Sequence, residues 1–255
     1  MFDSSTGAGK LRRGRRLLGE DGRTVLVAVD HAAYMGEGPT AEAIAAIAAG
    51  APDGLLAPLH IARSTAADFA HSGLILRIDG GISDLGDPAA EDLSALMYQA
   101  ELAATLGADA VVILVFPGTP DEHRSLTRLG ALCDQCERLG LVVMAEAIPG
   151  GWGQSVEWSF ENVAKASRLC VELGADMIKT LCPGPAADFA QVVEATPAPV
   201  VALGGPRSDS EDDLIDHVEG LIGAGAAGIA FGRNVWGSPD PTALIGRLKQ
   251  AVHGS

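Results

Sequence analysis

The chain alternates short, continuously apolar runs with longer segments whose apolar residues recur at helical spacing. Continuously apolar runs are typical of parallel strands that are covered on both faces. The runs predict strands at residues 24–30, 54–59, 74–79, 110–116, 141–147, 177–182, 199–205 and 228–233. The amphipathic segments between and after them predict helices at residues 40–49, 61–72, 89–107, 120–140, 159–174, 185–195, 211–224 and 241–253.

Eight strands and eight helices in strict alternation predict a single (β/α)₈ TIM barrel that spans residues 1–255, with residues 1–23 as an N-terminal arm or helix. Glycines placed just before strands, as in Leu106-Gly107-Ala108-Asp109 and Leu173-Gly174-Ala175-Asp176, agree with this alternation. A doubly wound open sheet is the rival fold. It calls for a glycine fingerprint after the first strand, where this chain has Val29-Asp30-His31-Ala32 instead.

Composition narrows the classes of partner. The net charge of −15 argues against nucleic acid or an anionic membrane as the main partner. One basic cluster, Lys10 to Arg16, fits either an anion-binding arm or, as we favour, a solvated or subunit-contacting helix. The first residues lack the apolar core of a secretory signal, and no apolar stretch approaches the length of a membrane span. We therefore expect a cytoplasmic protein.

Cysteine usage gives no strong signal for a metal or redox site. Cys133 and Cys136 form a C-x-x-C motif, but it lies within a predicted helix and has no second pair at zinc spacing. We interpret both residues, together with Cys170 and Cys182, as small, buried or half-buried side chains.

The carboxyl ends of the strands should carry the chemistry, because active sites of (β/α)₈ barrels form there. Lys179 stands out on the sixth predicted strand, since the chain has only four lysines and an ammonium is costly to bury without a partner. An amine held among apolar side chains can attack a carbonyl and form a Schiff base. The alternative is a structural lysine that pairs with a strand-end carboxylate such as Asp30.

The last two strands end in Gly204-Gly205 and Gly232-Arg233. Barrels frequently bind phosphate at these two loops, where glycine lets the backbone N–H groups approach the anion and an arginine adds charge. The alternative is that these glycines only permit tight turns.

Three further strand-end residues are candidates for moving protons or holding the substrate. Asp30 and Glu146 could each transfer a proton near Lys179, or form a structural ion pair. His31 could act as an acid, act as a base or bind the substrate, although a histidine at the end of a strand is more often a packing residue.

These residues resemble the archaeal-type (DhnA-type) class I aldolases. The similarity is carried in order by Val29-Asp30-His31, the segment from Leu173 to Thr180, Gly204-Gly205-Pro206-Arg207 and the segment from Gly228 to Val235, and it runs over nearly the whole chain. The family includes fructose-bisphosphate aldolases, aminodideoxyheptulosonate synthases, related seven-carbon precursor synthases and a thiolase acting on phosphorylated autoinducer-2. The resemblance implies a Schiff-base lysine at Lys179 with Asp30 nearby, a phosphorylated keto or aldehyde substrate, a homo-oligomer, and no metal or organic cofactor.

One segment departs from the family pattern. Its fifth strand usually ends in Tyr-Pro-Arg-Gly with a proton-transferring tyrosine, whereas this chain has Ile148-Pro149-Gly150-Gly151. Either another group, with Glu146 the best placed, takes over the proton transfer, or the reaction differs from the cleavage of a sugar bisphosphate. We expect a carbon–carbon lyase or synthase in which Asp30 and Glu146 transfer protons, acting on a compound such as dihydroxyacetone phosphate or a sugar phosphate. The alternatives are a related biosynthetic condensing enzyme or thiolase, a non-catalytic barrel that binds a phosphorylated metabolite, or an isomerase working through carboxylates alone.

Overall fold

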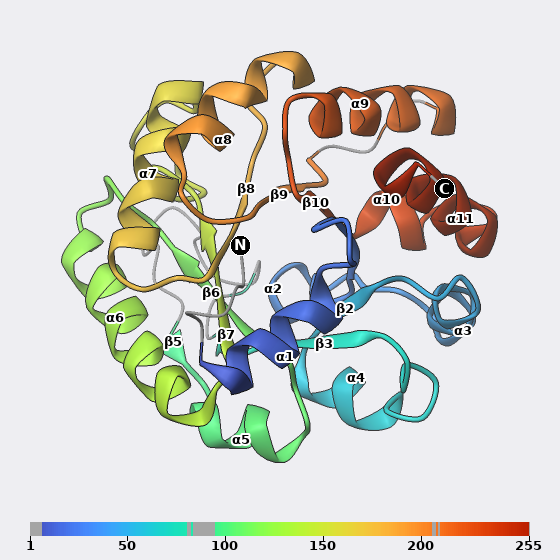
Figure 1. The fold of residues 1–255 in the computed structure, drawn as a ribbon, viewed down its shortest axis with the longest axis horizontal. Helices are drawn as coiled ribbons and strands as arrows, with labels where there is room; N and C mark the ends of the chain where they lie inside the picture. The colour runs from blue at the N-terminus through green and yellow to red at the C-terminus, as the bar shows by residue number, and fades with distance from the viewer. Residues whose placement is uncertain (1–6, 81–82, 84–94, 206–207, 209, 255) are drawn as a thin grey trace.

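The computed structural model describes residues 7–80, 83, 95–205, 208 and 210–254. Eight parallel strands close into a barrel in the order β1-β10-β9-β8-β7-β6-β3-β2, and β4 pairs with β5 outside it (Figure 1). The predicted (β/α)₈ barrel is thereby confirmed. The strands are β1 Thr24–Ala28, β2 Gly54–Ala57, β3 Gly73–Arg77, β4 Asp79–Gly80, β5 Ala95–Leu96, β6 Ala110–Val115, β7 Val142–Ala147, β8 Met177–Thr180, β9 Val200–Leu203 and β10 Gly228–Phe231.

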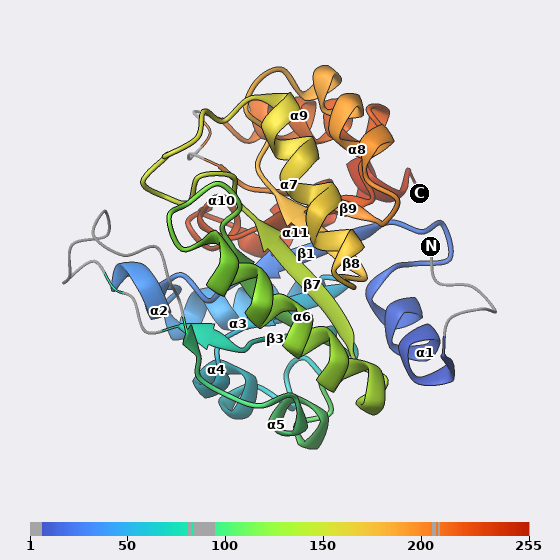
Figure 2. The same cartoon turned by 90° about the vertical axis from the view of Figure 1, so that its left-hand side faces the viewer.

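Helices form a ring around the strands, and two short helices stand at opposite ends of the barrel. Figure 2 shows α1 at one end and α2 at the other. Figure 1 shows α1 crossing the view inside the helical ring. The helices are α1 Ala8–Leu17, α2 Ala32–Met35, α3 Ala41–Ala49, α4 Leu59–Ser64, α5 Ala100–Thr105, α6 Glu122–Leu139, α7 Phe160–Glu172, η1 Ala186–Phe189, α8 Ala190–Ala195, α9 Glu211–Gly223, α10 Arg233–Trp236 and α11 Pro241–His253.

Two predicted helices were wrong in extent. The helix expected at residues 89–107 is α5, only Ala100–Thr105, since the backbone of Ala95–Leu96 pairs with β4 and the Met97 N–H donates to the carbonyl of Ile78. The remainder of that prediction, residues 89–94, falls outside the described part of the chain. The helix expected at 61–72 ends at Ser64, and the hydroxyl of the next residue, Thr65, donates a hydrogen bond to the carbonyl of Ile61.

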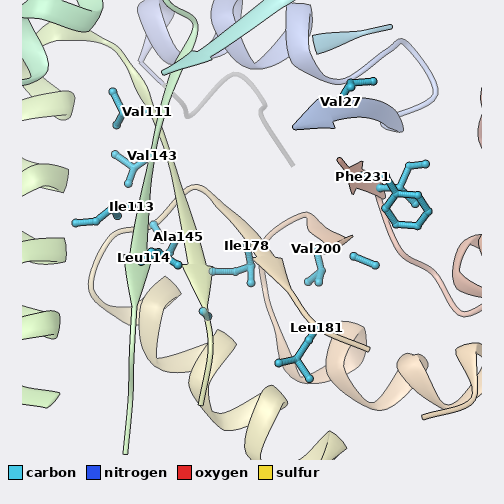
Figure 3. Packing of buried hydrophobic residues seen from close by; sticks show 14 of the residues in the cluster. Val27, Val111, Ile113, Leu114, Val143, Ala145, Ile178, Leu181, Val200 and Phe231 are labelled. Carbon is cyan, nitrogen blue, oxygen red and sulfur yellow. The ribbon is translucent and has the colours of Figure 1, made fainter. Parts of the chain in front are cut away.

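The apolar side chains of each strand alternate between two cores. One face of the strands packs under the helices, as Figure 3 shows for Val27, Val143, Ile178 and Phe231. The other face fills the barrel interior, so the strands are apolar on both faces. The interior cluster contains Leu17, Leu18, Leu26, Ala28, Leu56, Ile75, Ala110, Val112, Val142, Met144, Met177, Val201 and Ala230.

Closure of the barrel depends on one glycine. Gly228 lies opposite Thr24 in the β1–β10 pair and has φ of +148°, and a Cβ there would stand 1.9 Å from the Thr24 carbonyl oxygen. Since every other residue type carries a Cβ, glycine is required where the last strand meets the first.

The basic cluster of α1 packs on the amino-terminal end of the barrel. The Lys10 ammonium is buried and lies 3.0 Å from Asp176 and 2.8 Å from Glu137, and Arg16 lies 3.0 Å from Asp109. Both aspartates also accept a backbone N–H from a neighbouring strand. Lys10 and Arg16 of this cluster therefore form ion pairs within the protein, while Arg12 and Arg15 lie exposed on α1. Among the described residues, no helix is both long and apolar enough to span a bilayer.

Candidate active site

The inward face of four strands brings the candidate residues together. Side chains of a parallel strand alternate in direction, so residues two apart share a face. The interior residues Ala28, Ile75, Met144 and Met177 lie on the same faces as the residues two positions further along each strand. Those residues are Asp30, Arg77, Glu146 and Lys179, and all four are buried at the carboxyl end of the barrel.

Lys179 and Glu146 form a buried ion pair. They are register partners in neighbouring strands β8 and β7. The Lys179 Nζ lies 2.7 Å from Glu146 Oε1, and the two side chains are 6% and 7% exposed. The lysine therefore faces a carboxylate, not the wholly apolar surround that its neighbours in sequence suggested. The alternative pairing of Lys179 with Asp30 is not the one found, because Asp30 binds Arg77.

Arg77 joins the carboxylates of the site. Its Nε donates to Asp30 Oδ2 at 2.8 Å, its Nη1 donates to Asp79 Oδ1 at 3.2 Å, and its Nη2 donates to Glu146 Oε2. The guanidinium is 3% exposed. Each contact joins opposite charges in a water-poor environment, where such hydrogen bonds are strong. Burial alone would raise the pKa of Glu146, but Lys179 and Arg77 outweigh it and lower the pKa below its usual range.

Tyr34 adds a phenol to this group. The Arg77 guanidinium carbon lies 5.6 Å from the centroid of the Tyr34 ring, and the Tyr34 hydroxyl is 3.4 Å from Asp79 Oδ1. Burial raises the pKa of Tyr34, so the phenol is neutral at physiological pH. Asp79 in turn accepts the Leu114 N–H at 2.8 Å, which fixes it to strand β6.

The two glycine-bearing strand ends lie side by side. An Arg233 Nη2 donates to the carbonyl of Gly205 at 3.2 Å, and the Asn234 amide donates to the carbonyl of Gly204 at 3.0 Å. A Cβ at Gly232 would come within 2.8 Å of the Ala28 carbonyl oxygen, so this loop passes close to β1. Pro206 and Arg207 of the family motif lie outside the described residues.

His31 stands near this end of the site. It is half-buried at the start of α2, and its ring centroid is 6.2 Å from that of Trp236 in α10. Burial, followed by the positive charge of Arg233, lowers the pKa of His31, so the imidazole is neutral at physiological pH. The structure therefore places His31 beside Trp236, within electrostatic reach of Arg233, Asp30 and Lys179.

Ile148 is fully buried in the main hydrophobic core and offers no group for proton transfer. Glu146, two residues earlier, is the titratable side chain that β7 contributes to the cluster. In the loop after β7, the Trp158 indole N–H donates to the Pro149 carbonyl at 3.0 Å, and the Trp158 ring packs against the ring of Trp152.

The two cysteines of the C-x-x-C motif are buried helix residues. Cys133 and Cys136 lie buried in α6, and burial raises the pKa of both thiols to about 12. Among the described residues no group of three or more histidine, cysteine or carboxylate side chains is placed to hold a metal ion.

Sequence reasoning found Asp30, Glu146 and Lys179 but passed over Arg77 and Tyr34. Arg77 could have been found from strand parity, because it follows Ile75 by two residues and a charged residue on an inward face demands a partner. Tyr34 follows the first strand in a four-residue helix that no periodicity reveals, so the sequence held no signal for it.

A closed parallel barrel with a buried cluster of charged residues at its carboxyl end defines the class of (β/α)₈ barrels that carry their chemistry at that end. The model of the DeoC/LacD family aldolases matches residues 24–238, and the chain belongs to this family. The family resemblance and the barrel predicted from the sequence are both confirmed.

Relatives in the family carry out different reactions. The chain is 34% identical over 187 residues to 2-amino-4,5-dihydroxy-6-oxo-7-(phosphonooxy)heptanoate synthase of Streptomyces griseus, covering 73% of this chain and 67% of that protein. It is 32% identical over 251 residues to 2-amino-3,7-dideoxy-D-threo-hept-6-ulosonate synthase 1 of Archaeoglobus fulgidus, covering 97% and 92%. An archaeal fructose-1,6-bisphosphate aldolase, solved with its catalytic lysine bound to the carbinolamine intermediate, superimposes with a TM-score of 0.84 at 28% identity, covering 95% and 99%.

Proposed function

We propose that the protein is a Schiff-base-forming class I aldolase, a carbon–carbon lyase or synthase in which Lys179 attacks the carbonyl of a phosphorylated ketone. The observation that carries the proposal is the buried pair of Lys179 and Glu146 at 2.7 Å, at the end of the barrel where such active sites form. The similarity to an aldolase with a lysine-bound carbinolamine supports the same chemistry.

Glu146 is the group placed to accept a proton from the lysine. The Lys179 ammonium passes a proton to Oε1, and the free amine adds to the carbonyl carbon to form a carbinolamine. Loss of water, with the proton returned to the departing oxygen, gives the iminium. The iminium then accepts the electron pair of the breaking carbon–carbon bond, or its enamine form attacks an aldehyde.

Asp30 holds the other side of the site. Its Oδ2 is 2.8 Å from the Arg77 guanidinium, and its side chain is 9% exposed. A carboxylate at this place can accept the substrate hydroxyl proton that must leave during retro-aldol cleavage, and the hydrogen bond from Arg77 holds it in position. Ile148 leaves Asp30 and Glu146 as the proposed proton-transfer residues.

The phosphate of the substrate would bind at the last two strand ends. Gly204, Gly205 and Gly232 offer backbone N–H groups, and the exposed Arg233 side chain supplies a positive charge that already bridges the two loops. The neutral His31 beside them can donate a hydrogen bond to the substrate. Both similar synthases and the similar aldolase have phosphorylated or sugar-like compounds in their names, which fits a ketose phosphate or dihydroxyacetone phosphate.

Borohydride trapping tests the proposal. The protein is incubated with dihydroxyacetone phosphate, reduced with borohydride, digested and mapped by mass spectrometry. We expect a reduced adduct on the peptide that carries Lys179, absent in Lys179→Met and retained in Lys165→Met, whose side chain is 68% exposed on α7. The absence of an adduct with this ketone and with other small phosphorylated ketones and aldehydes would refute the iminium mechanism.

A biosynthetic condensing reaction is the second candidate. It is favoured by Ile148, which removes the usual proton-transfer tyrosine, and by the two synthases among the relatives. A covalent adduct at Lys179 without cleavage of fructose 1,6-bisphosphate would support this candidate, whereas cleavage of the bisphosphate would support the lyase. A homo-oligomer remains a prediction that sedimentation would test.

A further inference from the structure

The carboxylate of Glu146 is divided between two cations. Oε1 is 2.7 Å from the Lys179 ammonium, while Oε2 accepts from the Arg77 guanidinium. A carboxylate held on one oxygen by a fixed guanidinium has a fixed rotamer, and its second oxygen then has a fixed position. The position and the ionisation of the oxygen that faces Lys179 therefore depend on Arg77.

Arg77 is itself held in place from several directions. Nε binds Asp30, which follows β1, Nη1 binds Asp79, which begins β4, and the guanidinium lies over the Tyr34 ring. The side chain is 3% exposed, so it has little freedom to follow a moving partner. It lies on the inward face of β3, two strands away from Glu146 in the barrel order.

The charges of the cluster make Arg77 necessary. Three buried carboxylates, Asp30, Asp79 and Glu146, face two cations, Arg77 and Lys179. Without the guanidinium, Asp30 and Glu146 would share the single ammonium of Lys179, and crowded carboxylates take up protons. The other titratable groups near the cluster do not replace it, because Tyr34 and His31 are neutral and Arg128 of α6 acts on Asp79 and Tyr34.

We infer that Arg77 is a positioning residue for Schiff-base formation: it keeps Glu146 ionised and aims Oε1 at Lys179, so that the carboxylate accepts the lysine's proton. The inference rests on the proposed function and deepens it. The balanced step is the transfer of one proton from the Lys179 ammonium to Glu146, addition of the amine to the carbonyl, and release of one water as the iminium forms.

The test is the pH dependence of iminium formation in single-turnover trapping with dihydroxyacetone phosphate, reduced with cyanoborohydride between pH 4 and 8. We compare wild type, Arg77→Met and Arg77→Lys. The matched control is Lys10→Met, which removes another buried cation from two carboxylates at the opposite end of the barrel. Far-UV circular dichroism at each pH verifies that each variant is folded.

We expect wild-type trapping to show no loss from protonation of Glu146 above about pH 4, because opposite charges hold its pKa down. In Arg77→Met the pKa of Glu146 rises by about 1–3, or by more because the remaining carboxylates repel it. We therefore expect the yield of trapped adduct to decrease as the pH is lowered through about 6 to 4. At pH 7 we expect a loss of about 10-fold or more, since a displaced catalytic group costs roughly that much or more. Arg77→Lys restores part of the adduct yield at pH 7 and part of the wild-type pH dependence, and Lys10→Met keeps the wild-type pH profile.

A folded Arg77→Met with the wild-type profile would overturn the inference, as would a Lys10→Met profile that shifts equally. If Arg77→Met does not fold, Arg77→Lys decides, because an ammonium reaches fewer of the three carboxylates and a wild-type profile there would also overturn it. An absence of adduct in wild type at every pH would instead overturn the proposed function. The two failures are thus distinguishable.

Discussion

The buried pair of Lys179 and Glu146 can be tested by removing each partner alone and both together. The chain contains its own control, an exposed pair of the same residue types. Lys165 and Glu161 lie 2.6 Å apart on α7 with side chains 68% and 76% exposed, against 2.7 Å, 6% and 7% for the buried pair. The two pairs have nearly the same separation and differ strongly in burial, and Glu146 binds Arg77 in addition to its lysine.

The expected magnitudes differ strongly. Two unit charges 2.7 Å apart attract by about 6 kcal/mol at an effective dielectric constant of about 20. Desolvation offsets much of this gross attraction, so we expect a coupling energy of roughly 2–4 kcal/mol for Lys179→Met with Glu146→Gln. For Lys165→Met with Glu161→Gln we expect about 0.3–0.5 kcal/mol, because water screens the exposed helical pair.

The two single variants at the site should also differ. In Lys179→Met, Glu146 keeps the Arg77 guanidinium, so the carboxylate is not left without a cation. In Glu146→Gln the buried ammonium loses its counter-ion, and Arg77 loses one of three. We expect Glu146→Gln to destabilise the protein by about 3–5 kcal/mol and Lys179→Met by clearly less.

Equilibrium unfolding in urea at pH 7, followed by circular dichroism, gives the free energy of unfolding of all four proteins in each cycle. Additive effects at the buried pair, within about 0.5 kcal/mol, would refute the reasoning. So would a Lys179→Met variant that is less stable than Glu146→Gln, since the shared role of Arg77 would then be wrong.

Three further predictions concern other parts of the barrel. Leu17→Ala should lower the free energy of unfolding in urea by about 2–5 kcal/mol, because Leu17 is fully buried at the amino-terminal end of the barrel. The control, Arg12→Ala on the exposed face of α1, should change it little. Equal effects of the two substitutions would show that α1 is not part of the core. Burial lowers the pKa of His253, but hydrogen bonds to two aspartates outweigh it and raise the pKa above its ordinary value. The stabilisation of the fold by protonated His253 is therefore complete below about pH 6.5 and is lost as the pH rises through the higher pKa of the folded state. His253→Gln should therefore cost about 1 kcal/mol or less at pH 5.5 and still less at pH 8.5, and a cost that grows with pH would contradict this. The neutral thiols of Cys133 and Cys136 should resist a disulfide reagent at pH 8 until the protein unfolds, and rapid labelling of the native protein, mapped by mass spectrometry, would contradict their burial.

Most of the barrel followed from local patterns. Strands 110–116 and 141–147 were predicted within one residue of β6 and β7, and the helix at 241–253 matches α11, because a buried parallel strand and a capped amphipathic helix each have a local signature. Local signals failed where long-range pairing decided. Residues 95–96 read as helix but form β5, since their backbone groups bond to β4.

The site was predictable in its location and in part of its membership. Lys179, Glu146 and Asp30 were identified as strand-end residues, but the sequence left open which of the two carboxylates lies against the lysine. The partner could not be chosen from the sequence, because it depends on the register between β7 and β8, which places Glu146 opposite Lys179.

The sequence by itself determined the barrel, the end at which the polar residues gather and the lysine that stands out, because hydrophobic periodicity and strand ends are local properties of the chain. Only the tertiary structure decided which charges pair. Arg77, Asp79 and Tyr34 belong to the cluster because closure of the barrel brings the carboxyl ends of β1, β3, β7 and β8 together around one axis. Burial then makes each pairing energetically decisive, and no spacing along the chain encodes that.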